Sequence, residues 1–135
     1  MDVTTFPLIW RWNRPSHAVL PVDVLRALHP LTTAQIEALG LSPIKRFSPT
    51  IVQHRATGDA DETGRWLASL QLLGGRVIAV WNKDTALSLP WQTFVTYWSD
   101  FCYPSSDDVD IFVEAGPLVL RWCHDETFEY DGEAL

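Results

Sequence analysis

The chain has 135 residues, which is the usual length of one domain and too short for two. Its composition, 47% hydrophobic and 20% charged, excludes disordered, collagen-like and low-complexity proteins, because such chains lack the apolar side chains that form a core. The formal net charge of −7 argues against nucleic-acid binding, since an acidic surface repels phosphate groups. We therefore expect a single domain over residues 1–135.

The start of the chain and its apolar runs predict a protein that stays in the cytoplasm. The apolar stretch at residues 6–12 is interrupted by Pro7 and Arg11, which is untypical of a signal peptide. The longest apolar runs, such as residues 77–81, are far shorter than the roughly 20 residues that cross a bilayer. The two cysteines form no CxxC pair and lie in no secretory context. We expect a cytoplasmic protein with no membrane partner.

The first 30 residues predict one strand and one short helix. Residues 6–12 have the composition of a strand, on which Trp10 and Trp12 would share a face that could be exposed. Pro21 is well placed to open a helix, because its fixed φ suits the first turn. Pro30 would end that helix.

A second short helix and an edge strand are predicted next. Thr32 and Gln35 have the spacing of a capping box, and Gly40 would end the helix that they begin. Residues 41–57 contain prolines and are predicted to be mostly irregular, with a short edge strand near residues 50–54.

From Gly58 onward the periodicity becomes clearer. Acidic residues at 59, 61 and 62 suit the positive end of a helix that would end at the glycines 74 and 75. The apolar side chains that this helix would bury are Trp66, Leu67, Leu70 and Leu73. The apolar run at residues 77–81 has the length of a central strand covered on both faces.

The last 46 residues, roughly a third of the chain, predict a helix followed by a meander. Pro90 begins the helix, and a core-facing stripe at helical spacing follows it: Trp91, Phe94, Val95, Trp98, Phe101 and Cys102. Residues 108–114 alternate acidic with apolar side chains, as in a half-exposed strand, and two further strands follow a turn at residues 115–117. We predict an α+β fold: an antiparallel sheet with helices on one face, in which residues 1–57 form a helical and irregular part and residues 58–135 a helix–strand–helix–meander part.

Cys102, Cys123 and His124 are the candidates for a thiol nucleophile and its base. Cys102 continues the apolar stripe and Cys123 lies in a predicted strand, where a free cysteine behaves as a small hydrophobe. Neighbouring acids would raise a thiol pKa rather than lower it. Ser105 and Ser106 have no recognisable partner motif. We therefore predict no catalytic residue.

An acidic loop is the candidate for a metal site. Asp107, Asp108 and Asp110, with Asp125 and Glu126, could offer oxygen ligands to calcium or magnesium, although the EF-hand spacing is absent. A small metal-dependent hydrolase, or another enzyme that uses this loop, therefore stays open as an alternative. Histidines and cysteines lack zinc-ligand spacing, and no phosphate-binding glycine motif occurs. We expect neither a metal nor a cofactor.

Three stretches of the sequence carry a family resemblance. They are VIAVW at 77–81, WQTFVTYWSDFCYPSSDDVDI at 91–111 and LRWCHDETFEY at 120–130. Together they resemble a large group of small bacterial proteins, some of which are similar to immunity proteins of polymorphic and secreted interbacterial toxin systems. The resemblance implies a rigid helix-to-strand loop at residues 103–108 and a hairpin turn at residues 124–126. It also implies a protein that binds and neutralises a toxin.

The distribution of charge points to the same class of function. Residues 100–135 hold ten acidic side chains and one basic one, whereas residues 1–99 hold nine basic and seven acidic ones. Such asymmetry favours a basic partner, because complementary potentials speed association, although it could also serve solubility alone. We predict a non-catalytic immunity protein that occludes the active site of a toxin with a basic surface. The predicted partner-binding residues are Asp107, Asp108, Asp110, Glu114, Asp125, Glu126 and Glu129.

Overall fold

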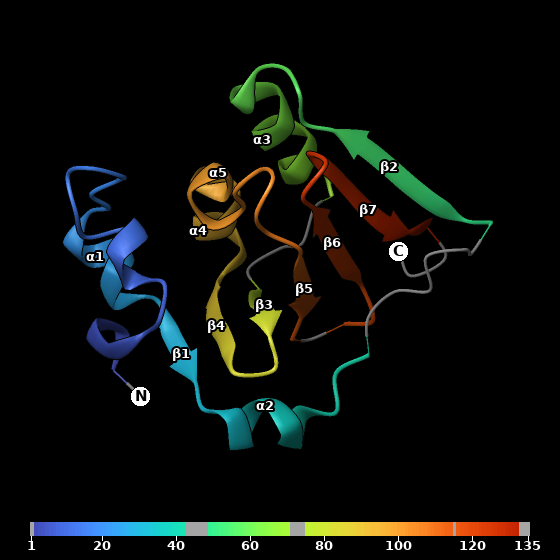
Figure 1. The fold of residues 1–135 in the computed structure, drawn as a ribbon. Helices are drawn as coiled ribbons and strands as arrows, with labels where there is room; N and C mark the ends of the chain where they lie inside the picture. The colour runs from blue at the N-terminus through green and yellow to red at the C-terminus, as the bar shows by residue number, and fades with distance from the viewer. Residues whose placement is uncertain (1, 43–48, 71–74, 115, 133–135) are drawn as a thin grey trace.

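The computed structural model describes residues 2–42, 49–70, 75–114 and 116–132. Within these residues, seven strands form one antiparallel sheet in the order β1-β4-β3-β5-β6-β7-β2 (Figure 1). The strands are β1 His29–Leu31, β2 Ile51–Arg55, β3 Arg76–Asn82, β4 Thr85–Pro90, β5 Val109–Val113, β6 Val119–Cys123 and β7 Thr127–Asp131. The helices are α1 Val22–Arg26, α2 Thr33–Leu39, α3 Ala60–Ser69, α4 Trp91–Thr96 and α5 Trp98–Phe101, with 3-10 turns η1 Val3–Thr5 and η2 Ile9–Arg11. The predicted α+β fold with an antiparallel sheet is confirmed.

The strand predicted at residues 6–12 is wrong. This segment forms the turn η2, and i→i+3 backbone hydrogen bonds hold it together. Phe6 and Trp12 are fully buried and stack on each other with ring centroids 5.7 Å apart, and the Trp12 indole N–H donates to the Asp100 carbonyl at 2.8 Å. Trp12 is therefore a core residue rather than an exposed one, because its ring and its N–H both find partners inside.

The two short N-terminal helices are confirmed. α1 begins directly after Pro21. At α2 the Gln35 N–H donates to the Thr32 hydroxyl at 3.1 Å and the Thr32 N–H donates to the Gln35 side chain at 2.8 Å, which completes the capping box. Gly40 ends α2 with φ of +57°, a left-handed conformation that other residues rarely adopt.

Residues 1–57 contribute both edges of the sheet. β1 pairs with β4 at one edge and β2 pairs with β7 at the other, the latter at the predicted edge-strand position. The sequence patterns missed β1, because it has three residues with a proline at its centre, and missed β4, whose last residue, Pro90, predicts the start of a helix. The N-terminal part is thus built into the same sheet as the remainder of the chain.

The helices after Gly58 lie where the apolar periodicity predicts them. Asp59 caps α3 by accepting a hydrogen bond from the Asp61 N–H at 2.9 Å. α3 ends at Ser69. The predictions that this helix buries Leu73 and ends at Gly74 concern residues outside those that the structure describes. Every member of the apolar stripe after Pro90 is buried, but the helix is divided into α4 and α5 at Tyr97.

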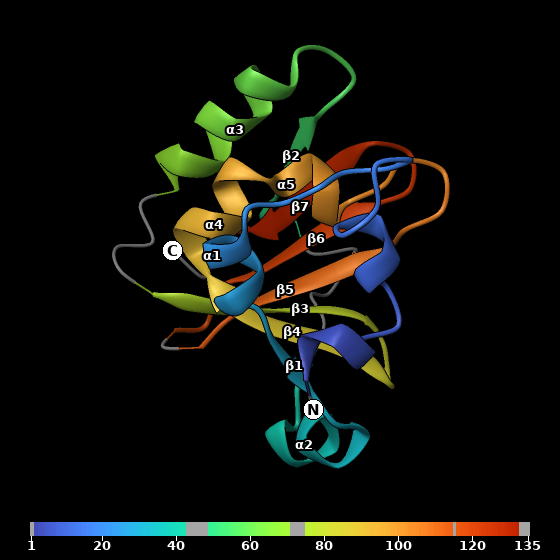
Figure 2. The same ribbon diagram turned by 90° about the vertical axis from the view of Figure 1, so that its left-hand side faces the viewer.

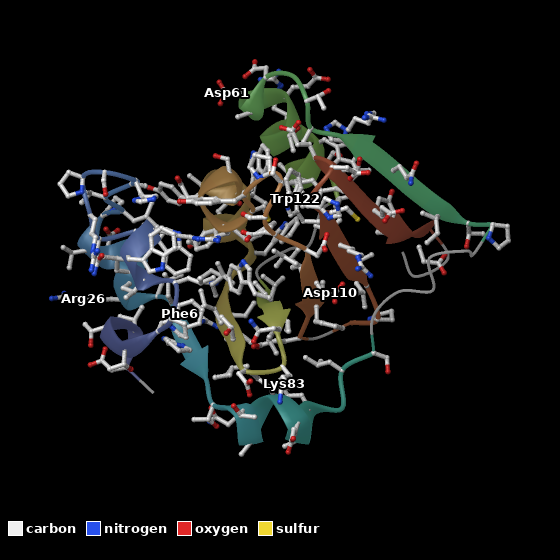
Figure 3. The ribbon with its side chains drawn as sticks, viewed as in Figure 1. Phe6, Arg26, Asp61, Lys83, Asp110 and Trp122 are labelled. Atoms are coloured by element: carbon white, nitrogen blue, oxygen red, sulfur yellow. The ribbon has the colours of Figure 1, made fainter. Side chains whose placement is uncertain are left out.

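The sheet has a helix-covered face and a more open face. Figures 1 and 2 show α1, α3, α4 and α5 on one side of the sheet and α2 on the opposite side. The larger core lies under the first group of helices, where Trp122 is 1% exposed (Figure 3). On the other face Ile78, Ala86 and Phe112 form a smaller buried cluster, against which Ile36 of α2 packs. In the described part of the chain, no helix is long and apolar enough to cross a bilayer.

Candidate functional site

Asp107 lies inside the molecule, so its predicted position at the rim of a binding surface is wrong. Its side chain is 6% exposed and forms a bidentate ion pair with Arg11, at 2.6 Å (Oδ2 to Nη1) and 3.0 Å (Oδ1 to Nη2). The Tyr103 N–H also donates to Oδ2, at 3.0 Å, and the Tyr103 ring lies 4.0 Å from the Arg11 guanidinium carbon. Burial alone would raise the pKa of Asp107, but these hydrogen bonds and the Arg11 charge outweigh burial and lower the pKa below its usual value. Asp107 therefore anchors η2 to the loop before β5.

Glu129 is also buried, contrary to the prediction of a rim charge. Its carboxylate accepts from Gln53 Nε2 at 2.9 Å and from Cys123 Sγ at 3.2 Å, and the side chain is 5% exposed. In register Glu129 lies opposite Arg121 of β6. Buried carboxylates require such hydrogen bonds. Through them Glu129 of β7 is bound to Gln53 of β2 and to Cys123 of β6, so it holds the three strands together.

Asp110 and Glu114 lie away from the other predicted carboxylates. Asp110 is half-buried in β5, in register with Arg121 (Figure 3). Glu114 is exposed just beyond the other end of β5 and accepts a hydrogen bond from the Ser88 hydroxyl at 2.8 Å. The seven predicted partner-binding residues therefore do not form one continuous surface.

Asp108, Asp125 and Glu126 do share one end of the sheet. The Asp108 carboxylate accepts from the backbone N–H and the ring Nδ1 of His124, both at 3.0 Å. Partial burial raises the pKa of Asp108, but these hydrogen bonds and the nearby positive charges lower it below its usual value. Asp125 and Glu126 form the tight turn between β6 and β7, where Glu126 has φ of +66°.

The acidic start of α3 lies at the same end of the molecule. The Ala56 N–H donates to the Glu126 carbonyl at 2.7 Å, which brings the segment before α3 to the β6–β7 turn. Figure 1 shows the start of α3 and the β6–β7 turn in its upper part, and Figure 3 labels Asp61 at the top. We call this surface the acidic end and define it by the carboxylates of Asp59, Asp61, Glu62, Asp108, Asp125 and Glu126.

In the described part of the chain one arginine is buried and two others are half-buried. Arg11 is buried against Asp107, and Arg76 is half-buried, where it donates to Ser88 Oγ at 3.0 Å and to the Ala27 carbonyl at 3.1 Å. Arg121 is half-buried in β6. β2 and α3 each carry one exposed arginine, Arg55 and Arg65. The fully buried charges of the described residues are those of Arg11, Asp107 and Glu129, so burial removes two acidic groups and one basic group from the surface.

The thiols and serines do not assemble into a nucleophilic site. Cys102 is 1% exposed, and burial together with the Asp107 charge raises the pKa of its thiol well above the usual value. Cys123 is buried and donates to Glu129, whereas the His124 ring bonds to Asp108. Both thiols therefore lie as the sequence analysis predicts, in the interior.

The acidic loop does not converge on one point. Asp107 turns toward Arg11 and Asp108 toward His124, while Asp110 lies within β5. Among the described residues, no three His, Cys, Asp or Glu side chains come close enough to hold a metal ion. The geometry of this loop therefore lends no support to the alternative of a metal-dependent hydrolase.

The structure also contains an apolar groove that the sequence analysis missed. It has a volume of about 500 Å³ and lies between the end of α2 and the open face of the sheet, lined by Leu39, Leu41, Ile78, Phe112 and Val119 among others. Leu39 is 47% exposed at its edge. Apolar side chains of α2 that have no buried partner could have indicated a groove. The groove itself exists because α2 crosses the open face of the sheet.

Comparisons with known proteins provide no precedent for this site, because no family model, curated protein or solved structure matches the chain. Functional inference therefore depends on the chemistry and geometry of the described residues.

Proposed function

We propose that this chain is a non-catalytic binding protein, an immunity protein whose acidic end docks on the basic surface of a bacterial toxin and occludes its active site. The observation that carries the proposal is the gathering of exposed and half-exposed carboxylates at one end of the sheet, while Arg11 is buried against Asp107. Complementary potentials of this kind accelerate association and select against partners of the wrong charge.

The acidic end is held in place before any partner arrives. The hydrogen bonds of Asp108 to His124 fix the start of β5 against the β6–β7 turn, and the Ser105 N–H donates to the His124 carbonyl at 2.9 Å. Preorganised groups lose less conformational entropy on binding. These contacts therefore favour a rigid recognition surface.

Tyr103 supplies an aromatic side chain beside these charges. It lies in the same loop as Asp108, is half-buried, and is fixed by its ring contact with Arg11. Tyrosines held in this way are frequent anchors of protein interfaces, where charged residues form the rim. We assign Tyr103 as the anchor and the acidic end as the rim.

The test is association with the protein encoded by the neighbouring gene, measured by stopped flow at several salt concentrations. Asp61→Lys with Asp125→Lys reverses two exposed charges of the acidic end, and Glu37→Lys with Asp23→Lys is the matched control away from it. We expect the first variant to associate about threefold or more slowly at low salt, with weaker salt dependence, and the control to match the wild type. Equal association rates for the two variants would contradict the proposal.

A further inference from the structure

The two edges of the sheet are protected differently. β1 has three residues, and Pro30 at its centre has no N–H to donate. β2 has five residues in unbroken register with β7 and contains neither proline nor lysine, and it forms the right-hand edge of the sheet in Figure 1. Proteins usually shorten, interrupt or charge an edge strand to prevent further pairing. β2 has few of these protections, so it is the edge that another strand can extend.

The backbone of β2 presents a regular set of donors and acceptors at this edge. The bonds from Ala56 N–H to the Glu126 carbonyl and from Gly132 N–H to the Thr50 carbonyl, at 2.7 and 2.8 Å, show which residues bond to β7. In an antiparallel pair this set alternates, so residues 50, 52, 54 and 56 face β7. The N–H and C=O groups of Ile51, Gln53 and Arg55 then point away from the sheet, and no other described segment pairs with them.

We propose that two copies of this chain associate through their β2 strands, antiparallel, about a two-fold axis at Gln53. In this register Gln53 pairs with Gln53 of the second copy, and Ile51 pairs with Arg55 in both directions. The outward groups are spaced symmetrically about Gln53, so each donor of one copy meets an acceptor of the other. The two sheets would become one continuous sheet.

Charge complementarity favours a second copy over an unrelated strand. Arg55 is exposed, and in the proposed register it lies beside Ile51 of the other copy. Within that other copy, Ile51 is paired with Asp131 of β7. Residues 51, 55 and 131 lie on the same face of the sheet, so the guanidinium approaches that carboxylate twice in the dimer. On the other face, Val52, which is 37% exposed, would be covered by His54 of the other copy.

A pair of substitutions at Gln53 tests the backbone pairing. Gln53→Ala and Gln53→Pro both remove the side-chain bond to Glu129, but only proline removes the outward N–H. In sedimentation equilibrium up to about 1 mM protein, we expect the wild type and Gln53→Ala to dimerise with dissociation constants within about threefold, and Gln53→Pro to dimerise about tenfold or more weakly.

Arg55→Glu gives a second readout if Gln53→Pro fails to fold. The new carboxylate at position 55 of one copy lies near Asp131 of the other, so we expect about a tenfold weaker dimer. Arg65→Glu on α3 should leave the dimer unchanged. A wild-type chain that stays monomeric up to about 1 mM would overturn the proposal, including one that pairs β2 only with a different protein. So would a dimer that neither Gln53→Pro nor Arg55→Glu weakens. Neither result would bear on the proposed role of the acidic end.

Discussion

Arg11 and Asp107 are 96 positions apart in the chain and meet as a bidentate ion pair in the interior. Removing two charges from water is costly, and their mutual attraction offsets this cost only when the geometry is good and other hydrogen bonds are satisfied. Here Tyr103 contributes both a backbone hydrogen bond to the acid and a ring over the base. The pair therefore fixes the N-terminal turns to the loop that begins the acidic end.

Asp107→Asn should destabilise the protein strongly, because it leaves the Arg11 charge buried without a counter-charge. We expect a loss of about 3 to 5 kcal/mol in the free energy of unfolding, measured by urea denaturation at pH 7. Asp108→Asn, at an exposed carboxylate that is hydrogen-bonded to His124, should cost about 1 kcal/mol or less. Equal losses for the two variants would show that the buried ion pair contributes no more to the free energy of unfolding than the exposed contact of Asp108.

The pH dependence of stability should follow from the same carboxylate. Because the folded-state pKa of Asp107 lies below its unfolded-state value, its contribution is complete above roughly pH 4 to 5 and is lost as the pH falls through the lower folded-state pKa. The melting temperature of the wild type should therefore fall on acidification toward pH 2, and that of Asp107→Asn should fall less. Parallel curves would contradict this assignment.

At the scale of elements, the α4–α5 segment joins three parts of the fold through Trp98. Its ring packs against Trp122 of β6 and Phe128 of β7, with centroids 5.7 and 5.6 Å away, and its indole N–H donates to the Ala60 carbonyl of α3 at 3.1 Å. Helical periodicity predicts that this side chain is buried, but its partners come from strands and from another helix. Such a residue supports packing between elements rather than a ligand site.

Trp98→Ala should cost about 3 to 5 kcal/mol of stability, because it removes a large buried ring and leaves a cavity. Trp66→Ala should cost less, since Trp66 is half-buried and stacks on His54 near the sheet edge. Chemical denaturation of the two variants measures the difference. A Trp98→Ala protein that keeps its full stability but loses binding to its partner would place Trp98 in a site instead.

Gly40 and Gly75 allow the effect of backbone conformation on stability to be separated from the effect of steric space. A methyl group would meet nothing within 4 Å at Gly40 or at Gly75, but only Gly40, after α2, has a positive φ. We therefore expect Gly40→Ala to destabilise by about 1 kcal/mol and Gly75→Ala to be neutral or slightly stabilising. The comparison is made by thermal unfolding, and a neutral Gly40→Ala would show that the left-handed end of α2 carries no strain.

At the scale of the whole molecule, the N-terminal 57 residues and the rest of the chain build one sheet. β1 closes one edge and β2 the other, while Phe6 and Trp12 fill the core next to Trp81. The surface charge follows from the same arrangement, because the fold buries Arg11, Asp107 and Glu129 and leaves the carboxylates of the acidic end exposed or half-exposed. The acidic end and the open edge of β2 are both consequences of this topology.

The sequence by itself determined the elements whose signals are local. The capping box and Gly40 bound α2, the apolar stripe after Pro90 marks α4 and α5, and the alternation along residues 109–113 marks β5. These signals work because helices and strands have fixed periods of 3.6 and 2 residues, so neighbours in the sequence are sufficient to define a buried face.

Only the tertiary structure decided which carboxylates are buried and which are exposed. Asp107 and Glu129 have the same sequence signature as Asp108 and Asp125, yet the first two are buried because Arg11, Gln53 and Cys123 arrive from distant segments to satisfy them. Likewise, strand alternation cannot say which strands pair, so the sequence did not show that β1 forms the second edge or that α2 crosses the sheet beside a groove. The cost of burying a charge or a strand edge depends on partners far along the chain, and only the folded molecule brings those partners together.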